Sequence, residues 1–185
     1  IVTPTNLSLL HITEADQLDD QMQAWQQCNQ AQAITLTLYD QHGQPQKVRI
    51  RLEVAAFNFG VNEFALQLKM GRQVSDHFNE IAFHQLLGNL NEQTLPGGWV
   101  GDYLAAHPLA ENRYRVQTLA QQLKAIWAQK LHHTDGSEPY KAAQRVAMLC
   151  YEIGVIPCWN CKSGKDRTAW LDAEIKREAI TLHQG

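Results

Sequence analysis

The sequence predicts a mixed α/β domain that is rich in helices and carries a β-hairpin in its N-terminal half. Two observations support the hairpin and the helices. Apolar and polar residues alternate over two short segments within residues 34–54, whereas apolar residues recur at helical spacing through most of the second half. A third observation is a short apolar run that leads into a glycine-containing loop and then a helix, which predicts a strand–loop–helix unit.

The first elements are a helix and the hairpin. Leu18 and Met22 lie at helical spacing in a segment that predicts an amphipathic helix. Alternation over residues 34–38 predicts one strand, and alternation over residues 47–54 predicts its partner. The intervening residues 41–46 contain a glycine and a proline, which are typical of a turn.

The middle of the chain gives weaker signals than its C-terminal half. We expect a short helix near residues 80–90, a Pro-Gly-Gly break at residues 96–98, and then three helices. Gly154 ends the second of these helices, and residues 155–159 are predicted to form one buried strand. The apolar positions that define the three helices are Val116, Leu119, Leu123, Ile126 and Trp127; Ala142, Val146, Leu149, Cys150 and Ile153; and Leu171, Ile175, Ala179 and Leu182.

Composition narrows the class of protein. The 185 residues are 44% hydrophobic and 19% charged, which is typical of a globular domain rather than a disordered or membrane-spanning chain. The net charge of −3 gives no reason to expect a nucleic-acid partner. The four cysteines do not form a secreted disulfide pattern, so we expect a reducing compartment. We interpret residues 1–185 as a single catalytic domain of a longer protein, since the chain opens on Ile1.

The most informative stretch is residues 161–168, which read Cys-Lys-Ser-Gly-Lys-Asp-Arg-Thr. A loop of this length can turn its backbone N–H groups toward one tetrahedral oxyanion, and the helix that follows directs its positive end at the same point. Gly164 permits the unusual backbone angles of such a loop, and Arg167 can bind two phosphate oxygens as a fork. The same donors favour a thiolate at Cys161. This pattern is typical of thiol-based hydrolysis of phosphate esters.

The chemistry assigns a role to each residue of the loop. Cys161 is the predicted nucleophile, which forms a phosphocysteine intermediate, and Arg167 binds the phosphoryl oxygens together with the loop amides. The predicted substrate-binding residues are Lys162, Ser163, Gly164, Lys165 and Thr168. The two lysines place charge where further phosphates of the substrate would lie. The hydroxyl of Thr168 is expected to donate to the sulfur of Cys161.

Two aspartates are candidates for the general acid that protonates the leaving group. Asp166 lies inside the loop beside Arg167, although it could instead stabilise the start of the helix. Asp102 follows Trp99 on a separate segment, as the acid does in many enzymes of this chemistry. Its alternative role is to cap a helix that begins at Tyr103.

Cys158 and Cys161 form a Cys-x-x-Cys pair, which on its own suggests a redox dithiol or half of a metal site. The nearby His132 and His133 have the wrong spacing for a typical zinc finger, so no metal is expected. A redox dithiol would open the helix with its first cysteine, whereas here the second one precedes it. Cys158 is either a small buried strand residue or a partner that protects Cys161 from overoxidation.

The motif resembles that of a known family. Residues 159–168, Trp-Asn-Cys-Lys-Ser-Gly-Lys-Asp-Arg-Thr, are similar to the active-site motif of the SopB/SigD/IpgD family of inositol phosphate phosphatases, which bacteria deliver into host cells by type III secretion. Residues 171–178 and 135–141 resemble the same family. Residues 57–63, Phe-Asn-Phe-Gly-Val-Asn-Glu, do so too, and they also resemble a second motif of eukaryotic inositol polyphosphate 4-phosphatases.

The resemblance implies a substrate and a place of action. The substrates would be phosphoinositides such as phosphatidylinositol 4,5-bisphosphate, attacked at the 4-position, or soluble inositol polyphosphates. The site of action would be the cytoplasmic face of host membranes, with host proteins bound through regions outside this chain. No metal or organic cofactor would be needed. Similar lipid phosphatases of the myotubularin and Sac types carry an aspartate before the loop arginine, which favours Asp166 as the acid.

Two features depart from the family pattern. Ala169 and Trp170 stand where the family has Gly-Met, and Trp170 would affect the pocket or the access of lipid. The chain is also much shorter than family members. Two rival interpretations therefore stay open: a protein tyrosine phosphatase, which the extra lysines disfavour, and a module that binds headgroups or a host protein without turnover.

Overall fold

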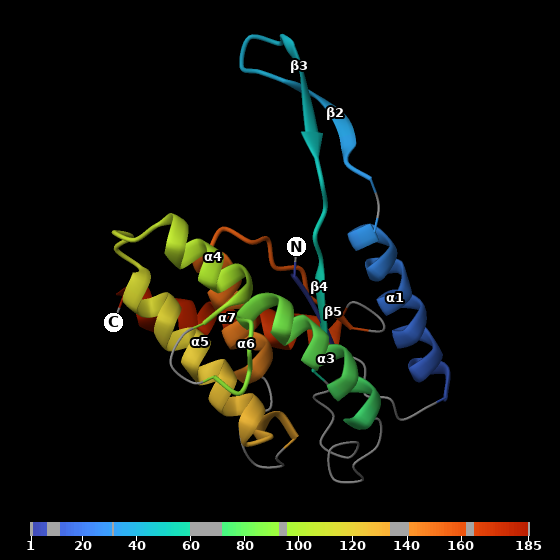
Figure 1. Ribbon diagram of the computed structural model, residues 1–185. Helices are drawn as coiled ribbons and strands as arrows, with labels where there is room; N and C mark the ends of the chain where they lie inside the picture. Colours follow the sequence, from blue (N-terminus) through green and yellow to red (C-terminus); the bar gives the residue numbers. More distant parts are fainter. Residues whose placement is uncertain are drawn as a thin grey trace.

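The computed structural model describes residues 2–6, 12–30, 32–59, 72–92, 96–133, 141–161 and 165–184 (Figure 1). Strands and helices are mixed, as predicted, and helices dominate. The elements in chain order are β1 (Val2–Asn6), α1 (Ile12–Gln30), β2 (Ile34–Tyr39), β3 (Pro45–Ile50), β4 (Ala55–Asn58), α3 (Arg72–Leu87), α4 (Gly98–Ala106), α5 (Arg113–Ala128), the 3-10 helix η1 (Leu131–His133), α6 (Lys141–Glu152), β5 (Asn160–Cys161) and α7 (Asp166–Gln184).

A three-stranded parallel sheet lies at the centre of the molecule, in the order β4-β1-β5. Strand β1 pairs with both neighbours, so that Thr5 lies opposite Asn58 on one side and Asn160 on the other. Asn6 lies opposite Cys161. Because all three strands run in the same direction, their carboxyl ends meet at one edge of the sheet.

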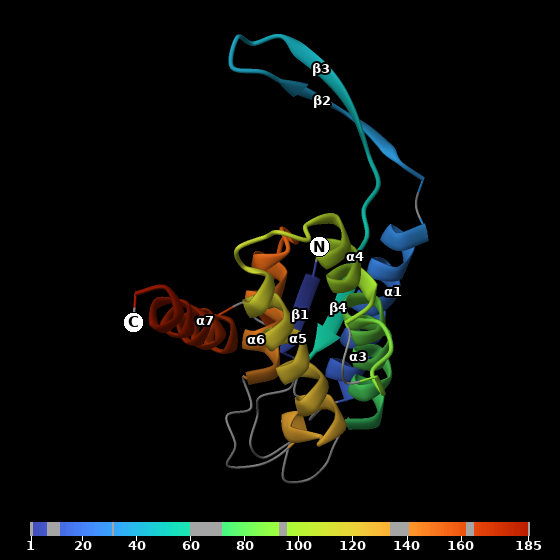
Figure 2. The same cartoon turned by 60° about the vertical axis from the view of Figure 1, so that its left-hand side comes forward.

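The main hydrophobic core lies between one face of the sheet and α3 to α7 (Figure 2). Alternate residues of β4, Phe57 among them, point into this core. The rings of Phe57 and Phe83 meet edge to face at 4.9 Å, and Phe83 in turn lies 5.3 Å from the ring of Trp127. This aromatic chain joins β4, α3 and α5, and fixes the sheet relative to the helices.

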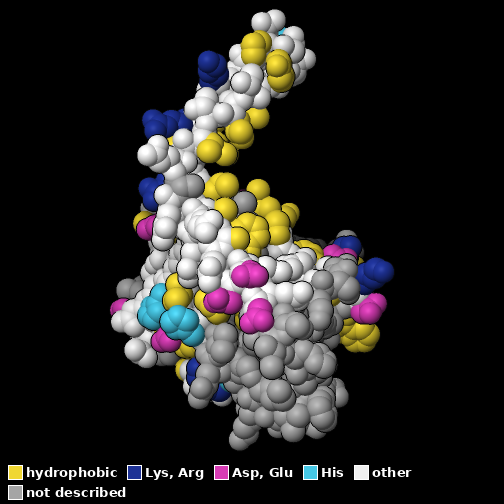
Figure 3. Space-filling view, turned by 90° about the vertical axis from the view of Figure 1, so that its right-hand side faces the viewer, with side chains coloured by type: hydrophobic (Ala, Val, Ile, Leu, Met, Phe, Trp, Pro, Cys, Tyr) yellow, Lys and Arg dark blue, Asp and Glu magenta, His cyan; other side chains and the backbone are white. Residues whose placement is uncertain are grey.

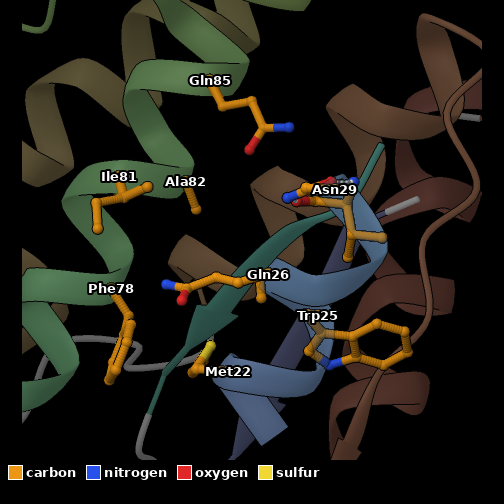
Figure 4. A pocket seen from close by; sticks show the side chains of 10 residues that line it. Met22, Trp25, Gln26, Asn29, Phe78, Ile81, Ala82 and Gln85 are labelled. Carbon is orange, nitrogen blue, oxygen red and sulfur yellow. Dashed lines mark hydrogen bonds between the residues drawn. The ribbon is translucent and has the colours of Figure 1, made fainter. Parts of the chain in front are cut away.

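Helix α1 covers β4 from the other side, where Leu18 and Met22 pack with Ala56 and Phe78. The side-chain amide of Asn29 donates to the carbonyl of Val54 at 2.7 Å and accepts the backbone N–H of the same residue. A pocket of about 40 Å³ is left between α1 and α3 (Figure 4). Its lining residues are Met22, Trp25, Gln26, Asn29, Val54, Ala56, Phe78, Ile81, Ala82 and Gln85, and none of these is charged.

The predicted hairpin is confirmed, and it projects away from the body of the protein (Figures 1 and 3). Its register pairs Ile34 with Ile50 and Leu36 with Val48, so one face of the ribbon is apolar. Lys47 lies opposite Thr37 on the other face. Figure 3 shows hydrophobic side chains on one side of the projection and basic ones on the other.

The strongly periodic helices are also confirmed as α5, α6 and α7. Gly154 ends α6 as predicted: its φ is 74°, and the N–H of Val155 donates back to the carbonyl of Cys150 at 2.8 Å. Within the described residues, no helix is long and apolar enough to cross a membrane.

Several boundaries were predicted wrongly. The helix expected near residues 80–90 is α3, which begins at Arg72. The return strand of the hairpin ends at Ile50, and residues 55–58 form the separate strand β4 because they pair with β1 instead. The buried strand expected over residues 155–159 is absent from this described segment, where Ile156 is 64% exposed; the strand is limited to residues 160–161.

Candidate active site at the carboxyl ends of the parallel strands

Cys161 is the last residue of β5 and lies at the carboxyl edge of the sheet. Its pairing with Asn6, the last residue of β1, fixes this position. The residue is only 4% exposed. In parallel α/β sheets, ligands bind outside the carboxyl ends of the strands, and the position of Cys161 agrees with that rule.

Helix α7 begins at Asp166, shortly after Cys161. Lys165 accepts the first helical hydrogen bond, from the N–H of Ala169 at 2.8 Å. The backbone N–H groups at the start of such a helix have no partner within the helix, and its dipole favours an anion there. Strand β5 therefore ends in a buried cysteine, and α7, which follows it in the chain, has an N-terminus that can bind a phosphate group.

The structure places only part of the predicted loop. Lys162, Ser163 and Gly164 lie outside the described residues, and so does the side chain of Arg167. Asp166 is the first residue of α7 and is exposed, and Lys165 beside it is exposed too. Asp166 therefore lies at the start of the helix, where it could stabilise the helix dipole. Because the residue is exposed, its carboxyl group is also open to a substrate.

Thr168 lies on the first turn of α7 with a buried hydroxyl. Its Oγ1 has no hydrogen-bond partner among the described residues, so the predicted bond to the sulfur of Cys161 is not formed in this structure. A buried hydroxyl without a partner costs free energy, on the order of 1–3 kcal/mol. Thr168 therefore has a donor available for a ligand at this helix end.

The motif at residues 57–63 reaches the same edge of the sheet through Asn58. Asn58 is the last residue of β4, and it lies level with Asn160 across Thr5. Its side chain donates to Ser75 Oγ at 2.8 Å, while Asn79 accepts its backbone N–H at 2.7 Å and donates to its carbonyl at 2.9 Å. Asn58 thus anchors β4 to α3. Asn62 and Glu63 lie outside the described residues.

Asp102 does not cap a helix, because it lies inside α4. A cavity near the start of α4 shows where this helix sits. Trp99 lines it together with Arg51 and Glu53, which precede β4, and with residues 154–156, which precede β5. The start of α4 is therefore at the amino ends of the strands, at the opposite edge from Cys161.

Cys158 is an exposed free thiol, so its prediction as a buried strand residue is wrong. The chain reaches the sheet only at Asn160, and Cys158 precedes that point. None of the four cysteines, all of which lie within the described residues, forms a disulfide.

A polar cluster that the sequence did not predict joins α3 to η1. The Nε2 atoms of His132 and His133 lie 3.0 and 2.8 Å from Asp76 Oδ1. Burial alone would raise the pKa of Asp76, but the hydrogen bonds from the two histidines outweigh it and hold that pKa well below its usual value. Burial lowers the pKa of His132, and the bond to Asp76 offsets only part of this effect. The adjacent histidines were the visible signal, whereas nothing in the sequence links them to Asp76.

Comparisons with known proteins match the whole chain. Residues 1–185 match a family described as "Enterobacterial virulence protein IpgD". The inositol phosphate phosphatase SopB of Salmonella bongori is 56% identical over 169 residues, which cover 90% of this chain and 40% of that protein. SopB of Salmonella typhimurium is 54% identical over 173 residues, which cover 92% of this chain and 30% of that protein. The inositol phosphate phosphatase IpgD of Shigella flexneri is 41% identical over 187 residues, covering 100% and 34%. The chain spans between 30% and 40% of the length of these relatives.

Proposed function

The chain belongs to the IpgD family of enterobacterial virulence proteins, and from that premise we propose that it is a cysteine-dependent phosphatase domain acting on phosphoinositides or inositol polyphosphates. Residues 1–185 would form one catalytic domain of a longer effector. One observation carries the proposal: Cys161 is buried at the carboxyl end of a parallel strand, and the N-terminus of α7 follows at Asp166.

The reaction has two steps. In the first, the sulfur of Cys161 attacks phosphorus, the P–S bond forms, and the bond from phosphorus to the ring oxygen breaks. Asp166 gives its proton to the leaving oxygen. In the second step, Asp166 takes a proton from water, the water oxygen bonds to phosphorus, and the P–S bond breaks to release inorganic phosphate. Neither step requires a metal or an organic cofactor.

The start of α7 stabilises the charge that builds up on the phosphoryl group. Its free backbone N–H groups and the guanidinium of Arg167 bind the phosphoryl oxygens. Thr168 supplies the hydroxyl that has no partner among the described residues, either to an oxygen of the substrate or to the sulfur of Cys161. Ser163 and Gly164 complete the loop.

The substrate class follows from the charge and the relatives. In this proposal Lys162 and Lys165 bind the further phosphates of a polyphosphorylated ring, and Lys165 is exposed. The curated relatives are named inositol phosphate phosphatases, which supports the same class for this chain. We propose the 4-phosphate of phosphatidylinositol 4,5-bisphosphate as the group removed, at the cytoplasmic face of host membranes after secretion. Trp170, which is 57% exposed and lies near the start of α7, offers an apolar contact to such a membrane.

The test is the release of inorganic phosphate from vesicles that contain phosphatidylinositol 4,5-bisphosphate and from soluble inositol polyphosphates. We expect Cys161→Ser to abolish release from both. Cys158→Ser is the matched control, because that thiol is exposed and is not part of the loop, and it should leave release unchanged under reducing conditions. Asp166→Asn should slow the first step most for substrates with poor leaving groups.

Two outcomes would replace the proposal. Binding of inositol phosphates without release would favour a headgroup-binding module. Faster release from a phosphotyrosine peptide than from any inositol phosphate would favour a protein tyrosine phosphatase.

A further inference from the structure

The cluster of Asp76, His132 and His133 is a set of ligands of the kind that bind transition metals. It brings together one carboxylate from α3 and two imidazoles from η1, and their potential ligand atoms all lie within 4.8 Å of one another. We propose that these three side chains bind a divalent transition-metal ion, with zinc as the ion that the ligand set favours. This site is separate from the proposed phosphatase chemistry and does not rest on it.

The distances suit a metal with little rearrangement. Asp76 Oδ1 lies 3.0 Å from His132 Nε2 and 2.8 Å from His133 Nε2. In a tetrahedral zinc site with bonds of about 2.0–2.1 Å, ligand atoms stand about 3.3 Å apart. The Asp76 carboxylate would therefore need to move only about half an ångström from each imidazole nitrogen, and the three ligand atoms already lie within 4.8 Å of one another. Without the ion, the same atoms are close enough to be held together by hydrogen bonds.

The two histidines are held in place before any ion binds. The ring of His132 stacks on that of Trp127 at 5.2 Å with only 10° between the planes, and its side chain is 3% exposed. Lys130, in the turn between α5 and η1, has a φ of 53°, which is unusual for a residue other than glycine. This turn directs both histidines back toward α3. A preformed ligand set reduces the conformational entropy that metal binding must overcome.

Metal binding at His132 replaces the hydrogen bond between its Nε2 atom and Asp76 Oδ1. To ligate a metal, Nε2 must give up its proton and the ring must carry it on Nδ1 instead. Nδ1 of His132 is buried and has no partner among the described residues. Nδ1 therefore has no hydrogen bond to lose when the ring changes tautomer. Among the described residues, no partner of Nδ1 favours the tautomer that carries its proton on Nε2.

The chemistry of the ligands selects the ion. Imidazole nitrogens combined with one carboxylate suit zinc and its neighbours, whereas magnesium and calcium prefer oxygen ligands. Asp76 and His133 keep 25% and 14% of their side chains exposed, so water can occupy a fourth position. The ammonium of Lys130 lies 3.3 Å from Asp76 Oδ2 and 3.7 Å from the centre of the Trp127 ring, and its charge would weaken the binding of a cation.

A bound ion would tie the first part of α3 to η1, which follows α5. Asp76 directly follows Ser75, which accepts a hydrogen bond from Asn58 at the carboxyl edge of the sheet. The ion would therefore stiffen the support of that edge. We assign it a structural role, because its ligands come from α3 and η1, two elements that are far apart in the sequence.

The experiment is calorimetric titration of the chelator-treated protein with zinc, in a background that carries Cys28→Ser and Cys158→Ser so that the more accessible thiols do not bind the metal. We expect one ion per chain. His133→Ala should weaken binding at least tenfold, and it is the milder variant because its ring is the more exposed of the two. Lys130→Gln should tighten binding, since it removes the competing charge.

Cobalt provides a second measurement. Its visible absorption should show bands of a nitrogen- and oxygen-ligated tetrahedral ion without the charge-transfer band of a thiolate. An unfolding temperature that rises with zinc in the parent but not in His133→Ala would support the site independently. Absence of zinc binding in the parent would overturn the proposal. So would zinc binding in His133→Ala and Asp76→Asn that is as tight as in the parent. Tightening in Lys130→Gln that disappears when His133→Ala is added would identify these ligands directly.

Discussion

Asn79 holds the end of β4 with both atoms of its side-chain amide. It accepts the N–H of Asn58 at 2.7 Å and donates to its carbonyl at 2.9 Å, and both residues are 1% exposed. Asn79→Ala removes both of these buried hydrogen bonds, so we expect a loss of unfolding free energy of about 2–4 kcal/mol. Urea denaturation measures it. Asn89→Ala is the control, because its side chain bonds only locally to Asn91 in an exposed turn, and it should cost less than about 1 kcal/mol.

Lys124 is a buried cation that donates hydrogen bonds to backbone carbonyls of the loop after α3. Its side chain donates to the carbonyls of Asn89 and Glu92 at 2.9 and 2.6 Å, and the residue is 1% exposed. Burial lowers its pKa, and the charge of Glu92 opposes that shift. Lys124→Met keeps the apolar stem but removes both hydrogen bonds, so we expect a loss of roughly 2–3 kcal/mol in chemical denaturation.

The matched control for that variant is Lys176→Met on α7. Its ammonium pairs with Asp172 at 2.6 Å, but 70% of the side chain is exposed. An exposed pair at this spacing contributes about 0.3–0.5 kcal/mol. Equal effects of the two lysine variants would contradict the role given to Lys124.

At the scale of elements, α3 and α4 meet through glycines. Gly88 has a φ of 72°, and a Cβ added there would lie 2.6 Å from the Cα of Gly97. Gly88→Ala combines an unfavourable backbone angle with a clash against backbone that cannot move aside. We expect a loss of more than about 3 kcal/mol, read as a lower unfolding temperature.

A variant at Gly43, in the hairpin turn, distinguishes the cost of the backbone angle from the cost of the clash. Its φ is 73°, nearly the same, but nothing lies within 4 Å of an added Cβ. Gly43→Ala should therefore cost only the backbone term, about 1–2 kcal/mol at most. If both variants lose the same unfolding free energy, the close approach of Gly88 and Gly97 does not contribute to the cost of Gly88→Ala.

The hairpin is the element most separate from the core. Among the described residues, neither buried cluster includes a side chain from β2 or β3. Because Ile34 and Ile50 are paired, an Asn-Gly turn can join them when residues 35–49 are removed. We expect the unfolding temperature to change by no more than a few degrees. A large fall would mean that the ribbon supports β4.

The sequence predicted those elements whose signal is local. The hairpin and α5 to α7 carry strong periodicity, and the structure confirms them. Strands β1 and β4 have five and four residues, too few for a pattern, and their place in the sheet depends on pairing between distant segments. The same reason hid Asp76, whose contacts with His132 and His133 span more than fifty residues of sequence.

At the scale of the whole molecule, the sheet brings together two motifs that are far apart in the chain. Asn58 and Cys161 both end strands that flank β1, so these two residues lie at one edge of the sheet. Sequence alone predicted the second motif as a unit of strand, loop and helix, because its residues are contiguous. It left the role of Asn58 open, since the anchor to α3 depends on Ser75 and Asn79.

This arrangement makes a prediction that needs no turnover. If the start of α7 binds oxyanions, tungstate should raise the unfolding temperature, because an ion at one hundred times its Kd adds about 2.7 kcal/mol to the stability of the folded state. Cys161→Ser should keep this effect, since the N–H donors remain. Arg167→Lys should lose most of it, because an ammonium cannot form the paired bonds of a guanidinium.

Arg177→Lys is the matched control for that experiment. Arg177 lies on the same helix but is exposed and pairs with Glu174 at 2.9 Å, well beyond the first turn. Its variant should respond to tungstate as the parent does. Equal stabilisation of all the variants would place the anion elsewhere on the protein. Loss in Arg167→Lys alone would mean that the helix end binds phosphate-like ions independently of the thiol, so any failure of turnover would then reflect the chemical step rather than recognition.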